Sequence, residues 1–162
     1  MDGVLICRVS EDETVSLRHS VLWPNHPVSH VLLPEDSNGF HYGAFLPSHS
    51  LPVAVISLFK DNLSVSDHLN GDERRTVLAA RFRKFACDPS HRNRGIGTKL
   101  LQHAFAMARS EMDCDVIWCD ARVSTAEWYE RRGMARFGEV FYKEDIPYIR
   151  RKATLYDNAR QL

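Results

Sequence analysis

The chain has 162 residues, of which 44% are hydrophobic and 26% are charged, a balance typical of one folded domain over residues 1–162. Lysine plus arginine and aspartate plus glutamate each number 21, so the global charge gives no reason to expect nucleic acid as a partner. No apolar run approaches the roughly 20 residues of a membrane span, and the first residues lack the pattern of a signal peptide. We therefore expect a cytoplasmic or nuclear protein without membrane or nucleic-acid partners, either a monomer or a homodimer.

The metal-binding and disulfide-forming residues show no regular spacing. The eight histidines occur without an HExxH pattern or a Cys/His cluster, so we expect no metal site. The cysteines contain no CxxC pair, and a domain of this length does not need disulfides to fold. Free thiols are therefore expected at all four positions, Cys7, Cys87, Cys114 and Cys119.

The first half of the chain predicts a strand, a helix and a hairpin. Residues 4–9 are apolar and β-branched, which favours a strand. Asp12 or Thr14 is expected to cap a helix that Pro24 stops. Two further strands are expected on either side of a turn at 47–50, at residues 40–46 and 53–59. The polar segment 61–74 contains Asn70-Gly71 and predicts a loop.

The second half predicts strands alternating with two helices. A strand is expected at 77–86, ending at Cys87-Asp88-Pro89, and apolar residues at helical spacing from Ile96 to Ala108 predict a helix with one buried face. A buried strand at 116–119 precedes a helix from about Ser124 to Arg132, with Gly133 in a left-handed position after its end. The last two strands are expected at 137–142 and 148–155.

A glycine-containing loop lies between the strand at 77–86 and the helix that follows it. Gly95 and Gly97 let the backbone approach a ligand closely, and the first amides of a helix have no partners within it. The partial positive charge of the helix end adds to the charges of Arg92, Arg94 and Lys99. This combination predicts a site for a diphosphate, although a tight turn without a ligand accounts equally well for the glycines alone.

Two motifs resemble the GCN5-related N-acetyltransferase (GNAT) superfamily. The segment Arg92-Asn93-Arg94-Gly95-Ile96-Gly97 matches the family signature Arg/Gln-x-x-Gly-x-Gly/Ala. The resemblance implies that these residues and Thr98 bind the diphosphate of acetyl-CoA. It also implies a bulged strand whose backbone pairs with the pantetheine arm, here at Phe85, Ala86 and Cys87.

The second motif, residues 121–134, carries a tyrosine that the family places beside the cofactor sulfur. Tyr129 stands four residues before Gly133 and is the expected general acid for the leaving thiolate, although such a tyrosine can also be a core aromatic. The sequence departs from many members at Arg122, where they have Asn, and at Met134, where they have Phe. Tyr148 replaces a frequent histidine, so its role is open.

The general base is less well defined, because the strand at 77–86 carries no carboxylate. Asp120 and Glu139 are candidates for a base or a substrate contact. Asp120 can equally cap a helix, and Glu139 can be a solvent-facing strand residue. Water can also accept the proton of an amine that is already partly neutral. The Cys87 thiol lies beside a cationic loop, but no Cys-His-Asp order supports an acyl-enzyme.

The resemblance implies an α/β (α+β) fold with a mixed, mainly antiparallel central sheet of six to seven strands flanked by helices. It implies transfer of an acetyl group from acetyl-CoA to a primary amine of a small molecule or peptide, by direct attack in a ternary complex. A catalytically inactive CoA-binding sensor or interaction module is the alternative, because no obvious base is present. Acetyl turnover against a panel of amines separates the two.

Overall fold

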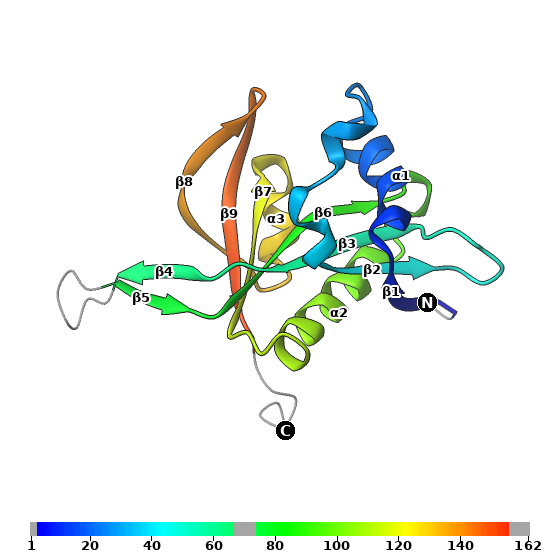
Figure 1. Ribbon diagram of the computed structural model, residues 1–162. Helices are drawn as coiled ribbons and strands as arrows, with labels where there is room; N and C mark the ends of the chain where they lie inside the picture. The colour runs from blue at the N-terminus through cyan, green and yellow to red at the C-terminus, as the bar shows by residue number, and fades with distance from the viewer. Residues whose placement is uncertain (1–2, 67–73, 156–162) are drawn as a thin grey trace. The chain divides into compact units, whose positions relative to one another are not determined.

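The computed structural model describes residues 3–66 and 74–155 (Figure 1). Contact clustering divides the chain into two compact units. The first contains the described residues up to Phe59 together with Phe82–Phe105, and the second contains Lys60–Arg81 and the described residues from Ala106 onward. Each unit is described below by itself, and the prediction of a single domain stays a prediction.

The strands confirm the predicted fold class. A seven-stranded sheet has the order β1-β2-β3-β6-β7-β9-β8, and a separate pair is formed by β4 and β5. The pairs β1/β2, β2/β3, β7/β9 and β8/β9 are antiparallel, and β6 pairs with β7 in parallel. The sheet is therefore mixed and mainly antiparallel, as the resemblance implied.

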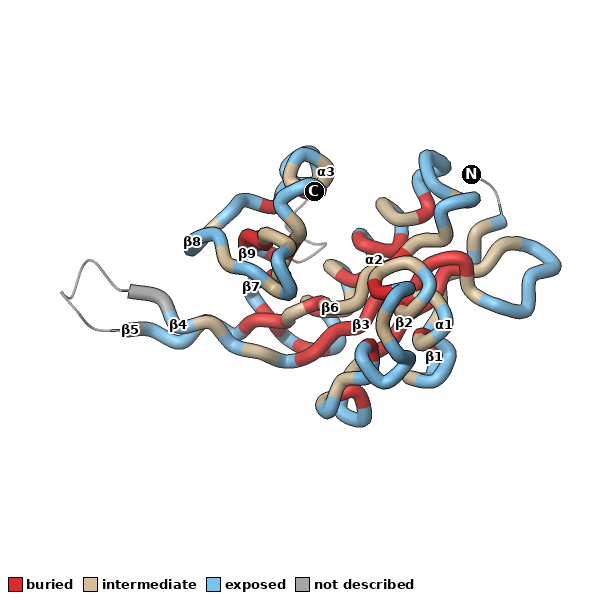
Figure 2. Tube along the Cα trace, turned by 90° about the horizontal axis from the view of Figure 1, so that it is seen from above, coloured by how far each residue is buried: buried red, intermediate tan, exposed pale blue. Residues whose placement is uncertain are grey.

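The first unit is built on three antiparallel strands and a helix. The strands β1 (Leu5–Val9), β2 (Phe40–Phe45) and β3 (Ala54–Lys60) confirm the predicted hairpin. Residues 54–59 of β3 are all buried, as Figure 2 shows. The helix α2 (Ile96–Ser110) contributes buried Ile96 and Leu100 to this unit. Helical periodicity identified the core positions of α2 correctly, whereas β3 is a continuous run that is buried on both faces.

The helix expected after the first strand is present, but its cap was predicted wrongly. Ser10 caps it: its hydroxyl accepts from the Glu13 amide at 3.4 Å, and the Glu13 carboxylate accepts from the Ser10 amide at 3.2 Å. This reciprocal capping box starts the helix before Asp12 and Thr14. Its turns are irregular: a 3-10 segment (Glu11–Thr14), α1 (Val15–Leu17) and a π-helical segment (Arg18–Leu22). Two short 3-10 helices follow at Val28–Val31 and Pro34–Asn38.

The second unit begins with a hairpin where the sequence predicted a loop. The strands β4 (Leu63–Ser66) and β5 (Arg74–Val77) pair antiparallel, with Leu63 opposite Val77. The strands are only four residues long and lie in a polar segment, so the short alternation in Leu63-Ser64-Val65-Ser66 was not recognised as a strand. Asn70 and Gly71 lie outside the described residues. The next strand, β6 (Ala79–Cys87), begins two residues later than expected and ends where predicted.

The remaining elements follow the predicted order. They are β7 (Val116–Arg122), a 3-10 turn (Val123–Thr125), α3 (Ala126–Glu130), β8 (Ala135–Lys143) and β9 (Ile146–Thr154). Gly133 has a φ of +86°, and the Met134 amide donates to the Tyr129 carbonyl at 3.1 Å. This is the expected left-handed end of a helix. Among the described helices, none is both long enough and apolar enough to cross a membrane.

Candidate functional site

The glycine-containing loop of the first unit has the open backbone that the sequence predicted. Asn93 and Gly95 both adopt left-handed conformations, with φ of +63° and +77°. A Cβ atom at Gly95 would meet no atom within 4 Å, so the space in front of this residue is open. Glycine is therefore required at position 95 by backbone conformation and leaves room for a ligand.

Hydrogen bonds hold the start of the loop in place. The Asp88 amide donates to the Val53 carbonyl at 2.8 Å, which ties the loop to the first residue before β3. The Asp88 carboxylate accepts from the Ser90 amide at 3.0 Å and from the Ser90 hydroxyl at 2.9 Å. These hydrogen bonds lower the pKa of Asp88, the amide contributing most, so the carboxylate is charged at neutral pH.

The end of the loop presents the N-terminus of α2. The Gly95 carbonyl accepts from the Lys99 amide at 3.0 Å, so the intrahelical ladder begins there and the preceding amides of the first turn lack partners within the helix. Buried Ile96 anchors this turn in the core. The side chains of Arg92, Arg94 and Lys99 are exposed. The positive end of the helix dipole and three exposed cations fit a diphosphate.

The strand before the loop is irregular where the resemblance implied a bulge. Lys84 in β6 has a φ of +55°, which interrupts the regular extended backbone three residues before the strand ends. Ala86 is buried, while Phe85 and Cys87 are partly exposed. Burial raises the pKa of the Cys87 thiol, against the opposing effect of Arg92. Cys87 is therefore a thiol at neutral pH, which speaks against a nucleophilic role.

Tyr129 lies in the second unit, on α3, with 9% of its surface exposed. Its ring packs edge-on against Trp128, with ring centroids 5.1 Å apart. Burial raises the pKa of Tyr129 well above its ordinary value, and the nearby Cys119 adds to this effect. The phenol therefore stays protonated at neutral pH, as a proton donor must.

Asp120 lies at the centre of a cationic cluster in the same unit. Its carboxylate, only 6% exposed, pairs with Arg81, with Lys143 at 3.1 Å and with Arg150 at 3.3 Å. Burial tends to raise the pKa of Asp120, but these three cations hold it below its ordinary value. Asp120 is charged and stabilised in that form by its ion pairs, so it is a weak base.

The other candidates lie on the last two strands. Glu139 is exposed, in the irregular part of β8 where the register with β9 shifts and Gly138 has a φ of +72°. Tyr148 is buried on β9 and stacks on Phe141, with centroids 5.9 Å apart. Its hydroxyl accepts from Arg122 Nε at 3.3 Å. Tyr148 thus joins the aromatic and cationic surroundings of Asp120.

Sequence reasoning missed the partners of Asp120, because they come from three other strands. In the sequence Arg150, Arg151 and Lys152 form one run of cations, but the structure buries Arg151 and leaves Arg150 half-exposed. The Arg151 side chain is 2% exposed and donates to the Met134 carbonyl at 3.1 Å and to Glu130 at 3.3 Å. Strand alternation was the available signal: neighbours on a strand point to opposite faces, so three consecutive cations cannot share one environment.

A buried polar network in the first unit contains the residues that approach metal-site geometry there. Glu11, Asp36 and His41 have potential ligand atoms within 4.8 Å of one another. Asp36 pairs with Arg18 at 2.8 Å, and the His41 ring nitrogens contact Ser57 Oγ at 2.7 Å and the Asp36 carbonyl at 2.9 Å. These contacts engage Asp36 and His41, while the buried Nε of Arg18 has no hydrogen-bond partner among the described residues.

Comparisons with known proteins agree with these features. Residues 56–133 match the family model described as an acetyltransferase (GNAT) domain. The chain is 26% identical over 154 residues to the uncharacterized N-acetyltransferase YitI of Bacillus subtilis (strain 168), covering 94% of each protein.

The fold is shared with solved acetyltransferases. A putative N-acetyltransferase from Lactobacillus plantarum superposes with a TM-score of 0.76 at 15% identity, covering 96% of this chain and 100% of the other. A chain of the NatC complex bound to Gag peptide and CoA superposes with a TM-score of 0.70 at 17% identity, covering 95% and 100%. The sequence motifs, the sheet and these matches agree: residues 56–133 match a GNAT acetyltransferase domain, and the chain as a whole is similar to N-acetyltransferases.

Proposed function

We propose that the protein transfers an acetyl group from acetyl-CoA to a primary amine by direct attack in a ternary complex. The observation that carries this proposal is the loop before α2, where left-handed Gly95, the N-terminus of α2 and three exposed cations fit a diphosphate. The CoA complex among the structural neighbours supports CoA as the donor carrier. Arg92–Thr98 would hold the diphosphate, and the backbone of Phe85, Ala86 and Cys87 would pair with the pantetheine arm.

In the transfer, the amine nitrogen attacks the thioester carbonyl and the C–S bond then breaks. A backbone amide near Ala86 or Cys87 stabilises the developing oxyanion. Tyr129 donates its proton to the departing sulfur, and its raised pKa keeps the phenol protonated, so that the proton is available. The protonated Cys87 thiol favours direct attack over an acyl-enzyme intermediate.

The acceptor nitrogen must lose a proton, and the carboxylates of the second unit differ in fitness for this task. Asp120 is held below its ordinary pKa by three cations, so we assign it a positioning role for those cations. Glu139 is exposed and can contact the acceptor or the solvent. We therefore propose that water takes the proton from the acceptor. Of the two candidate carboxylates, Glu139 is the better suited to assist this proton transfer, because it is exposed and Asp120 is engaged by cations.

Release of free CoA in the presence of a panel of primary amines tests this function. We expect amine-dependent turnover, and we expect Tyr129→Phe to lower kcat by about 100-fold, because it removes a general acid. Trp128→Phe, on the same helix, is the matched control and should keep most of the activity. CoA binding without acetylation of any amine, together with no effect of Tyr129→Phe, would instead favour the sensor function.

A further inference from the structure

The strand register of the second unit places several cations on one face of the sheet. Side chains paired directly across neighbouring strands project from the same face. The relevant pairs are Arg81 with Trp118, Trp118 with Lys152, Asp120 with Arg150, and Arg122 with Tyr148. Lys143 reaches the same face, since its Nζ lies 3.1 Å from Asp120 and 4.7 Å from the Tyr148 ring centroid. The face therefore carries five cations, Arg81, Arg122, Lys143, Arg150 and Lys152.

Among the described residues, the ion pairs and hydrogen bonds place fewer carboxylates than cations on this face. Asp120 pairs with three of the cations, and Asp61 lies 3.7 Å from Arg81. The Asp61 carbonyl accepts from Trp118 Nε1 at 2.8 Å, which fixes its position. Five cations thus face two carboxylates that are already engaged. This surface has an excess of positive charge that the net charge of the whole chain conceals.

Aromatic rings hold two of these cations in position. The Lys152 ammonium lies 5.0 Å from the Phe137 ring centroid, and within the described residues no carboxylate pairs with it. The Arg150 guanidinium lies 5.5 Å from the rings of Trp118 and Phe141, and its side chain is 49% exposed. Ring contacts restrict cationic side chains without neutralising them. Arg150 and Lys152 are therefore pre-organised and accessible.

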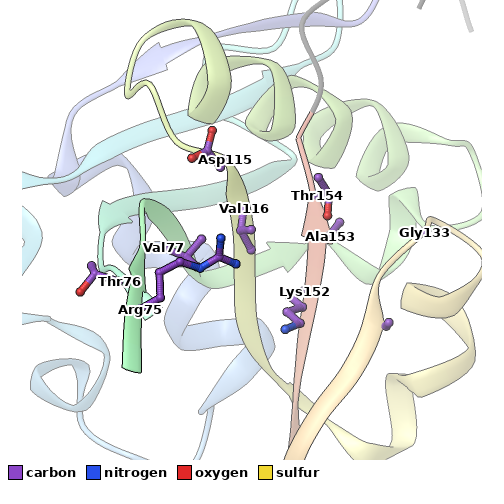
Figure 3. A pocket seen from close by; sticks show the side chains of 10 residues that line it. Arg75, Thr76, Val77, Asp115, Val116, Gly133, Lys152, Ala153 and Thr154 are labelled. Carbon is purple, nitrogen blue, oxygen red and sulfur yellow. The ribbon is translucent and has the colours of Figure 1, made fainter. Parts of the chain in front are cut away.

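A cavity of about 760 Å³ adjoins Lys152 in the same unit, as Figure 3 shows. Arg75 contributes a second cation to its lining. Asp115 is the carboxylate among the lining residues, and it pairs with Arg109 at 3.1 Å. The cavity therefore has room for a small molecule and keeps the positive character of the neighbouring face.

The opposite face of the same strands differs. Arg151, between Arg150 and Lys152, is buried and its terminal nitrogens are engaged by Met134 and Glu130. Structural pairing therefore accounts for that arginine. On the cationic face, the Asp120 pair engages Nε of Arg150 but leaves this side chain 49% exposed, and among the described residues no carboxylate pairs with the Lys152 ammonium.

We propose that the amine acceptor carries an anionic group, a carboxylate or a phosphate, which Arg150 and Lys152 bind. The inference rests on the proposed acetyltransferase function, because it assigns the substrate class of that reaction. An acceptor rich in positive charge, such as a lysine-rich peptide segment, would be repelled by the same face. A charge-assisted hydrogen bond to such an anion is worth about 10- to 100-fold in affinity.

Matched acceptors that differ only in their anionic group test the proposal. Glycine and phenylalanine are compared with glycinamide and phenylalaninamide, and phosphoethanolamine is compared with ethanolamine. We expect kcat/KM to be about 10- to 100-fold higher for the anionic member of at least one type of pair. A preference confined to the acids identifies a carboxylate, and one confined to phosphoethanolamine identifies a phosphate.

Three variants connect the preference to the face. Arg150→Gln and Lys152→Gln should each abolish most of the preference for the anionic member, and Arg150→Lys should restore part of it. Arg136→Gln is the matched control, because Arg136 is exposed on the same sheet but paired with Arg151, so that it projects from the opposite face. A loss of preference in Arg136→Gln equal to that in Arg150→Gln would overturn the assignment.

The outcomes separate this inference from the function on which it rests. Equal or better acetylation of the neutral members overturns the inference and leaves the acetyltransferase function standing. If no acceptor turns over, the proposed function fails, and calorimetric titration of the same pairs into the CoA-saturated protein decides the inference. Tighter binding of the anionic members, lost in Lys152→Gln, supports the anion site, whereas equal binding of both members overturns it.

Discussion

The loop that ends at Gly97 and the cluster around Asp120 are built in opposite ways. The loop uses the backbone of about ten consecutive residues, with left-handed Asn93 and Gly95 and the first turn of α2. The cluster uses side chains from β6, β7, β8 and β9, which meet only once the strands are in register. A site made from local backbone depends on a few special residues, whereas one made from distant side chains depends on the whole unit.

The largest expected difference between the two regions is in stability. Asp120→Asn leaves Arg81 and its neighbours without the carboxylate that neutralises them, so we expect the free energy of unfolding to fall by about 2–3 kcal/mol. Asp115→Asn is the matched control, because Asp115 lies at the other end of the strand in an exposed pair and should change stability by less than about 0.5 kcal/mol. Urea denaturation of both variants measures the difference, and similar losses would contradict the special position of Asp120.

A substitution in the loop is expected to lower the affinity for acetyl-CoA more than the stability of the protein. Gly95→Ala forces alanine into a left-handed conformation, at a cost of about 1 kcal/mol, and displaces the amides that face the diphosphate. Gly133→Ala is matched, since Gly133 has a φ of +86° and equally open surroundings. Both variants should lose similar stability, but only Gly95→Ala should weaken acetyl-CoA binding, by about tenfold in calorimetry. Equal weakening in both variants would remove the loop from the binding site.

The cluster around Asp120 also predicts a response of stability to acid. The folded protein lowers the pKa of Asp120, so the charged carboxylate contributes stability above its unfolded pKa of about 3.9, and this contribution is lost as pH falls through the lower folded pKa. Below about pH 4, the free energy of unfolding should therefore fall less steeply with decreasing pH in Asp120→Asn than in the unchanged protein. Parallel curves in that range would mean that Asp120 does not titrate with folding.

The smallest effect is expected at the start of the loop. Ser90→Ala removes one of the hydrogen bonds that lower the pKa of Asp88, while the stronger one from the Ser90 amide remains. The pKa of Asp88 should rise part of the way toward its ordinary value, and that of Asp120 should not change. Carboxyl chemical shifts followed by NMR measure both groups, and a shift at Asp120 would show that the two regions are coupled.

This difference explains which features were predictable. The order of strands, the helix with buried Ile96 and Leu100, and the left-handed Gly133 follow from local periodicity and from single residues with special backbone geometry. An open backbone conformation was expected at both glycines of the loop; Gly95 has one, whereas Gly97 lies within α2. The hairpin of β4 and β5 was missed, since each strand has only four residues and lies in a polar segment, so that the alternation of Leu63 and Val65 with serines was too short to be recognised.

The cluster was not predictable because no local rule identifies cross-strand neighbours. Asp120 was recognised as a candidate, but its ion pairs with Arg81, Lys143 and Arg150 depend on the register of four strands. The contrast between buried Arg151 and exposed Arg150 follows from alternation once β9 is placed. The role of Asp120 therefore changed from a possible base to a carboxylate that organises cations.

The central claim is that the loop binds CoA and not only a phosphate group. Calorimetric titration of the full chain with acetyl-CoA and, separately, with inorganic pyrophosphate tests this claim most directly. We predict much tighter binding of acetyl-CoA, because the irregular end of β6 adds contacts to the pantetheine arm beyond those of the loop. Equal affinity for the two ligands would contradict the account and leave only a phosphate-binding loop.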